Sequence, residues 1–163
     1  MAESRGKKFE GVIRECFESV PETSVMRLHD QMTGFKGSTN ICDFIVYHYP
    51  NQFFIECKSV QGNTFPFSNM TDKQYTGMLE MSKIYGVRAG LIVWWVDHDV
   101  TAYIPISFVK RQKALGRKSI HYSLATQGDF EGVDGPIEIP ARKKRTFFDY
   151  DMSILFEDIE SLF

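Results

Sequence analysis

Four segments of the chain carry the signals of helices, at residues 4–20, 71–85, 107–115 and 151–162. In the first, apolar residues recur at three- and four-residue spacing, and Pro21 ends the pattern. The second begins at Thr71 and stops before Gly86, a residue suited to the C′ position of a helix.

Four apolar runs predict strands, at residues 41–47, 54–60, 89–96 and 101–106. A polar, glycine-containing stretch leads into the first run, and the turn signal Tyr49-Pro50-Asn51 between the first two predicts a β-hairpin. The third run, AGLIVWWV, is continuously apolar, as in strands buried on both faces. From Gly116 onward we expect loops with one or two short strands. The order of helices and strands predicts a single α/β domain over residues 1–163.

Composition and charge set limits on this picture. A length of 163 residues is enough for one domain with a sizeable core. The formal net charge of −2 gives no overall basic field, so binding to nucleic acid would depend on local patches. Three cysteines without a CxxC pair argue against a disulfide framework and a zinc site. The polar N-terminus and the absence of a long apolar run predict a cytoplasmic protein without a membrane span.

Three charged residues stand out in the predicted hairpin. Glu56 and Lys58 interrupt its second strand and share one face, because residues two apart on a strand point the same way. Asp43 lies on the first strand. A turn centred on Pro50 and Asn51 would place Asp43 opposite Lys58, with Glu56 as the diagonal neighbour. Shifting the register by one residue on each strand would keep all three on one face.

This grouping has two interpretations. Two carboxylates suit a hard cation such as Mg²⁺, and a lysine beside them can act on water or on a phosphate, which together describe phosphodiester hydrolysis. Alternatively, the three are solvent-facing charges in mutual salt bridges, which are common on hairpins. The bulky apolar residues around them favour a hairpin inside the sheet, where converging charges need a function.

The ordered motifs resemble the PD-(D/E)XK nuclease superfamily, and more closely the RecU-type Holliday junction resolvases. The matching features are Asp43, Glu56-Cys57-Lys58, Thr64-Phe65-Pro66, Asp72-Lys73-Gln74 and the opening Arg5-Gly6-Lys7-Lys8-Phe9-Glu10. The resemblance covers residues 5 to about 105. It implies a restriction-endonuclease-like fold, with a central mixed β-sheet flanked by helices. It also implies a Mg²⁺-dependent endonuclease that resolves four-way junctions in DNA recombination and repair, with Mn²⁺ as a substitute metal.

The resemblance also implies roles for individual residues. Asp43, Glu56, Gln74 and the backbone carbonyl of Cys57 would bind the metal. Lys58 would stabilise the transition state or activate water, and Glu10 would help to hold the metal or its water, so the catalytic set is Glu10, Asp43, Glu56 and Lys58. A homodimer acting on branched DNA, with a recombinase as partner, follows from the same resemblance.

The sequence departs from the RecU pattern in three places. Ile41 stands where the family has Thr, the segment before Asp43 lacks the long stalk insertion, and the loop before Gln74 is one residue shorter. Two alternatives therefore stay open. One is a restriction- or repair-type endonuclease of the same fold, and the other is a catalytically inactive DNA-binding protein.

Several candidate residues also have structural explanations. Glu10 borders an apolar helical stripe, and Thr71-Asp72-Lys73-Gln74 fits a helix capping box. Asp97-His98-Asp99 lies between two strands, where such residues are normal in turns.

Basic residues form three local clusters that we expect to contact DNA phosphates. The candidates are Arg5, Lys7, Lys8, Arg111, Lys113, Arg142, Lys143, Lys144 and Arg145. The competing interpretation is that each cluster is an ordinary solvated face.

Overall fold

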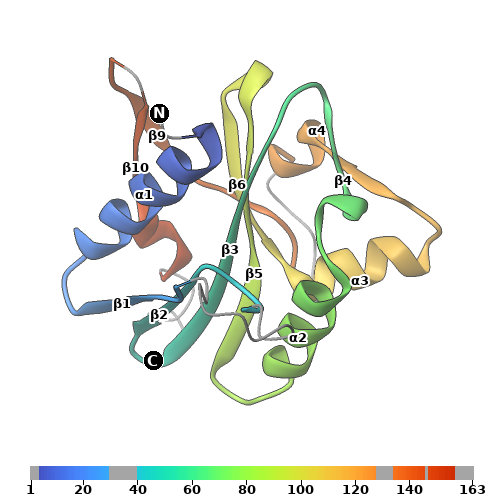
Figure 1. Cartoon of the computed structure of the whole chain (residues 1–163), viewed down its shortest axis with the longest axis horizontal. Coiled ribbons are helices and arrows are strands. Elements are labelled where there is room, and N and C mark those ends of the chain that lie inside the picture. The colour runs from blue at the N-terminus through green and yellow to red at the C-terminus, as the bar shows by residue number, and fades with distance from the viewer. Residues whose placement is uncertain (1–3, 30–39, 128–133, 146, 157–163) are drawn as a thin grey trace.

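The computed structural model describes residues 4–29, 40–127, 134–145 and 147–156. Among these residues, six strands form the main sheet, in the order β1-β2-β3-β5-β6-β8 (Figure 1). They span Thr23–Arg27 (β1), Phe44–His48 (β2), Asn51–Val60 (β3), Val87–Trp95 (β5), Val100–Pro105 (β6) and Ile137–Glu138 (β8). β3 and β5 run parallel and the other neighbours antiparallel. The prediction of an α/β fold with a central mixed sheet flanked by helices is confirmed.

Helices cover both faces of this sheet (Figure 1). α1 (Arg5–Glu18) packs on one face, over a core that includes Phe53 and Trp94. α2 (Asp72–Ser82) and α3 (Ile106–Ala114) pack on the other face, over a separate core that includes Leu91. α2 also lies in the crossover connection between β3 and β5. These strands are parallel, so a tight turn could not join them.

Shorter elements complete the two layers. They are β4 (Thr64–Pro66), η1 (Phe67–Asn69), η2 (Val96–His98), β7 (Ser119–His121), α4 (Tyr122–Ala125), β9 (Ala141–Lys143), β10 (Phe148–Tyr150) and η3 (Met152–Leu155). β4 pairs with β7 beside α4, and β9 pairs with β10 to form a hairpin beside α1. No helix in the described part of the chain is long and apolar enough to cross a membrane.

β1 was not predicted. Its sequence, Thr-Ser-Val-Met-Arg, lacks the alternation of a half-buried strand because β1 is an edge strand with mostly exposed side chains. It nevertheless pairs with β2 along its whole length. The segment between α1 and the hairpin therefore adds a strand to the sheet instead of forming a simple connection.

Two predicted helix ends were wrong. α2 ends at Ser82, and Gly86 is not its C′ residue: it adopts a φ of 83° in the turn that leads to β5, where its carbonyl accepts a hydrogen bond from the Gln52 N–H. At the carboxyl end, residues 152–155 form a 3₁₀ helix in place of the start of the predicted α-helix. The rest of that prediction, from residue 157, lies outside the described residues, as do residues 34–39 of the predicted polar stretch.

Candidate active site

The hairpin that carries the charged residues has a different register from the one predicted. His48 pairs with Asn51, so a two-residue turn lies one position earlier than expected. Asp43, which directly precedes β2, consequently lies beside Glu56 and not opposite Lys58. Because both strands shift by one residue, all three side chains remain on the same face of the sheet.

Asp43 is held by the strands on either side of it. Its backbone N–H donates to the Ile55 carbonyl (3.0 Å), and its own carbonyl accepts from the Leu28 N–H (2.8 Å). Its side-chain Oδ2 accepts from the backbone N–H of Cys57 (2.8 Å). Since the N–H and C=O of one strand residue point to the same edge, Cys57 also presents its carbonyl on the side of Asp43.

Glu56 is the centre of the charged group. Its side chain is 7% exposed, and its Oε2 lies 3.3 Å from Nζ of Lys58. The same oxygen accepts a hydrogen bond from Nε2 of Gln74 on α2 (2.8 Å). The Asp43 carboxyl is within hydrogen-bonding reach of Glu56 as well. The structure therefore brings these four predicted side chains together on the face of the sheet that α2 covers.

The two adjacent carboxyl groups shift each other's protonation. Burial raises the pKa of Glu56 to about 8; the charge of Asp43 adds to this rise, and the charge of Lys58 opposes it. Burial also raises the pKa of Asp43, while the hydrogen bond from Cys57 lowers it. In the metal-free protein, the pair consequently retains a proton near neutral pH.

Gln74 serves the helix and the site with opposite ends of its amide group. Its side-chain Oε1 accepts a hydrogen bond from the Thr71 backbone N–H (3.1 Å). Its backbone N–H donates to Thr71 Oγ1 (3.1 Å), which completes the capping box expected from the sequence. Its Nε2 donates to Glu56. A role as an oxygen ligand to a metal, which the resemblance implies, would require Gln74 to give up the bond to Thr71.

Gly77 lets α2 approach the segment that carries Asp43. A Cβ atom at residue 77 would lie 2.4 Å from Cγ2 and 3.0 Å from Cβ of Ile41. Ile41 is β-branched and stiff at χ1, so it could not move aside without moving its backbone. The Ile41 side chain thus packs into a gap that glycine provides.

We expect Gly77→Ala to destabilise the protein by about 1–3 kcal/mol, because the added methyl group would overpack against Ile41. Gly11→Ala is the matched control: Gly11 also lies inside a helix, but nothing is within 4 Å of its Cβ position. This control should be more stable than wild type by up to about 1 kcal/mol. Urea unfolding measures both changes. Adding Ile41→Ala to Gly77→Ala, which removes Cγ2, should recover part of the loss. Equal stability of Gly77→Ala and Gly11→Ala would contradict this explanation.

Glu10 lies on α1, which packs on the opposite face of the sheet from α2. Its Oε1 accepts a hydrogen bond from Nε of Arg27 at 3.0 Å. Arg27 also lowers the pKa of Asp43, so it electrostatically connects Glu10 to the acidic pair. Arg27 was not among the predicted site residues, because the strand that carries it was not recognised from the sequence.

The cluster Asp97-His98-Asp99 forms a turn, as predicted. Asp97 accepts a hydrogen bond from the Gly62 N–H (2.6 Å), and His98 Nε2 lies 2.6 Å from Oδ1 of Asn63. These contacts attach the β5–β6 turn to the loop after β3.

The predicted phosphate contacts at the start of α1 have an unusual electrostatic setting. Arg5, Lys7 and Lys8 occupy the first turn of a helix whose N-cap is Ser4, and no acidic residue lies in that turn. The positive end of a helix dipole disfavours cations, so this cluster lowers stability unless an anion lies nearby. Helix stability therefore does not account for these three positions.

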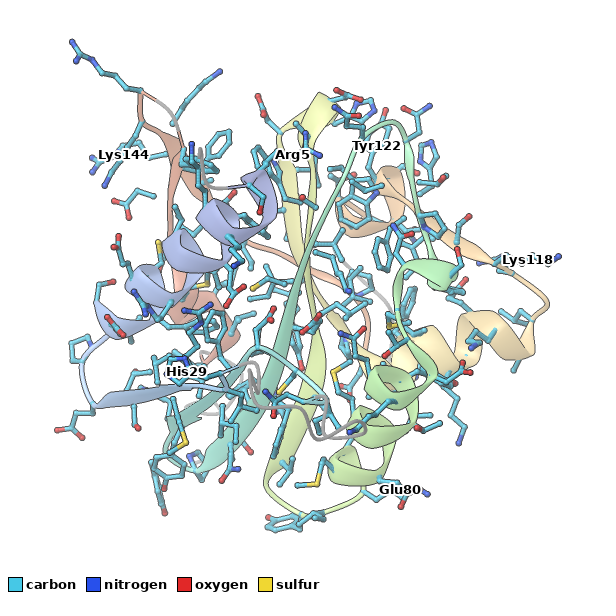
Figure 2. The ribbon with its side chains drawn as sticks, in the orientation of Figure 1. Arg5, His29, Glu80, Lys118, Tyr122 and Lys144 are labelled. Carbon is cyan, nitrogen blue, oxygen red and sulfur yellow. The ribbon has the colours of Figure 1, made fainter. Side chains whose placement is uncertain are left out.

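The other basic candidates lie on both sides of the sheet. Residues 142–145 belong to the β9–β10 hairpin beside α1, and Figure 2 shows Lys144 at the same end of the molecule as Arg5. Arg111 and Lys113 lie on α3 beside α2, and Nζ of Lys113 is 4.0 Å from the centre of the Tyr75 ring.

The oxygen atoms of the site suit a hard divalent cation. Two carboxyl groups are forced together in a buried position, and a cation between them would relieve their repulsion. The Cys57 carbonyl faces the same edge. Within the described ranges, no three His, Cys, Asp or Glu side chains are grouped to hold a metal. Water or substrate oxygens would therefore complete the coordination, as is usual for Mg²⁺.

No protein-family model matches the sequence, and no curated protein matches it. Among solved structures, the chain is similar to the 1.6 Å structure of Archaeoglobus fulgidus Hjc, a Holliday junction resolvase from an archaeal hyperthermophile. The TM-score is 0.47 and the sequence identity 12%, over 64% of this chain and 75% of that chain. A likeness of this degree assigns no activity.

Proposed function

We propose that the protein is a Mg²⁺-dependent endonuclease that hydrolyses phosphodiester bonds in branched DNA. One observation carries the proposal: Asp43, Glu56 and Lys58 converge on one face of a sheet that is otherwise packed with apolar side chains. Burying like charges beside each other costs free energy, so such a group indicates a binding or catalytic role.

Each residue would have a distinct part in hydrolysis. Asp43 and Glu56, with the Cys57 carbonyl, would hold the cation. A bound Mg²⁺ would polarise the phosphate and lower the pKa of a water molecule. Lys58, 3.3 Å from Glu56, would orient the attacking water and stabilise the negative charge that builds up on the phosphate oxygens. Gln74 would fix the orientation of the Glu56 carboxylate through its 2.8 Å hydrogen bond.

The finer parts of the proposal rest on the sequence resemblance to RecU-type resolvases. They are four-way junctions as the substrate, a role in recombination and repair, a homodimer, Mn²⁺ as a substitute metal and a recombinase partner. A two-fold symmetric dimer suits a junction, because resolution needs two paired cuts. The basic residues at the start of α1 support DNA as the substrate, since phosphates would neutralise charge that the helix dipole disfavours.

The test is a cleavage assay on a labelled four-way junction, a linear duplex and a single strand, with Mg²⁺, with Mn²⁺ and with EDTA. We expect paired symmetric cuts in the junction that require the metal.

Each other outcome has a definite meaning. Equal cutting of the linear duplex would favour a restriction- or repair-type nuclease and remove the junction specificity. Tight metal-independent DNA binding without cleavage in either metal would contradict an endonuclease activity. It would favour the alternative of a catalytically inactive DNA-binding protein.

A further inference from the structure

A groove of about 550 Å³ lies beside the candidate active site. It is formed by the β4–η1 segment, the start of α2 and the loop between α3 and β7. Tyr75 lines it and directly follows Gln74, whose amide contacts Glu56. The groove therefore lies at the same end of α2 as the candidate active site.

The lining combines an apolar floor with a cationic rim. Phe67 and Met70 form part of the floor and are 8% and 7% exposed. Lys113, Arg117 and Lys118 line the rim, and all three are exposed. Figure 2 shows Lys118 on the flank of the molecule beyond α3. An apolar surface beside clustered cations is what an unpaired nucleotide requires, because its base needs a surface to stack on and its phosphate needs a counter-charge.

Two contacts give the rim a fixed shape. The Lys113 ammonium lies 4.0 Å from the centre of the Tyr75 ring, and Nη1 of Arg117 donates to Oε1 of the buried Gln112 (2.6 Å). The Asp72 carboxylate also lines the groove, at the start of α2. Its charge would repel a phosphate from the helix end and leave the side of Lys113 as the favourable position.

We propose that this groove binds an unpaired nucleotide of the DNA next to the bond that is cut. The base lies on the apolar floor and the phosphate at the rim of Lys113, Arg117 and Lys118. The inference rests on the proposed nuclease function and adds a source of structure selectivity. A fully paired duplex has no free base to offer, whereas a gap, a bulge or a branch point with an opened base pair does. The size of the groove is within the range of small-ligand sites.

The test measures binding by the Lys58→Ala variant in EDTA, so that cleavage does not interfere. Two DNAs that share the same 2-aminopurine strand are compared. In one, the complement pairs with every nucleotide, and in the other, it leaves the 2-aminopurine nucleotide unpaired as a single-base bulge. We expect at least tenfold tighter binding of the DNA with the unpaired nucleotide, together with quenching of the 2-aminopurine fluorescence by stacking. Lys113→Ser with Lys118→Ser should remove the preference. Lys83→Ser with Lys110→Ser is the control, because it removes the same charge from exposed positions outside the groove.

Three results would overturn the inference. They are equal affinity for the two DNAs, unchanged fluorescence on binding, and a groove variant that weakens binding to both DNAs by the same factor, which would indicate ordinary backbone contacts. Cleavage by the wild type is measured separately. A protein that prefers the unpaired nucleotide but cuts neither this DNA nor the four-way junction would disprove the nuclease function and leave the groove proposal standing.

Discussion

Replacing Lys58 with alanine should lower the cleavage rate by about 10²–10³-fold, the effect of removing one group that stabilises transition-state charge. Affinity for the same DNA should change little, because Lys58 is one cation among the many that could contact the backbone. Affinity for Mg²⁺ should not fall, since the variant removes a positive charge 3.3 Å from Glu56. Single-turnover cleavage and a Mg²⁺ titration measure these quantities separately.

Lys83→Ala is the control for Lys58→Ala. Lys83 is also paired with a glutamate, Glu80, at 2.9 Å, but it is exposed at the end of α2. The Lys83→Ala variant should cut DNA at the wild-type rate. If Lys58→Ala cuts at that rate as well, the salt-bridge interpretation of the hairpin charges holds and the catalytic one is wrong.

Replacing Glu56 with glutamine should abolish cleavage and yet stabilise the metal-free protein above about pH 5. The folded-state pKa of Glu56 is raised from 4.5 to about 8, so the folded protein holds a proton that the unfolded chain releases. Stability is therefore lost as the pH rises from 4.5 to 8, and the loss is complete above the folded pKa. A glutamine avoids this cost, which amounts to a few kcal/mol at pH 8.

The measurement is chemical unfolding of wild type and Glu56→Gln in EDTA between pH 4 and pH 8.5. The two proteins should be close in stability at pH 4 and diverge in favour of the variant toward pH 8. Adding Mg²⁺ should stabilise wild type and leave the variant unchanged. Glu80→Gln, at an exposed carboxylate, should show no such divergence. A Glu56→Gln protein less stable than wild type at pH 8 would contradict the unfavourable burial of this charge.

The sequence was sufficient to predict that Asp43, Glu56 and Lys58 share one face of the sheet, but not how they are arranged on it. The alternation of Glu56 and Lys58 and the even-length turn placed the charged side chains on one face, and the structure has them there. The predicted neighbour of Asp43 was wrong. Pro50 and Asn51 are both good turn residues, so the sequence favoured a turn made of these two, whereas the structure forms it from Tyr49 and Pro50. The pairing of His48 with Asn51 defines the position of the turn, and this pairing depends on how the whole strand packs.

Other features depended on tertiary contacts that leave no local pattern. The exposed strand around Val25 has no alternation, so Arg27 and its contact with Glu10 were missed. For Gln74, the sequence offered a capping box and a site residue as alternatives, and the structure satisfies the hydrogen bonds of both with one amide. The packing of Ile41 against Gly77 joins two segments far apart in the chain, and neither residue marks the other in the sequence.

The Gln74 amide bonds both to Thr71 at the start of α2 and to Glu56. Fraying of the first turn of α2 would therefore also disrupt the site. The first turn of a helix opens more readily than its middle, on a timescale independent of any chemistry on DNA. Each opening takes away the donor that orients Glu56, so only molecules with the turn closed hold a complete site. The fraction of time in which this turn is closed therefore sets an upper limit on the fraction of protein ready to act, even in a population that is fully folded by every global measure.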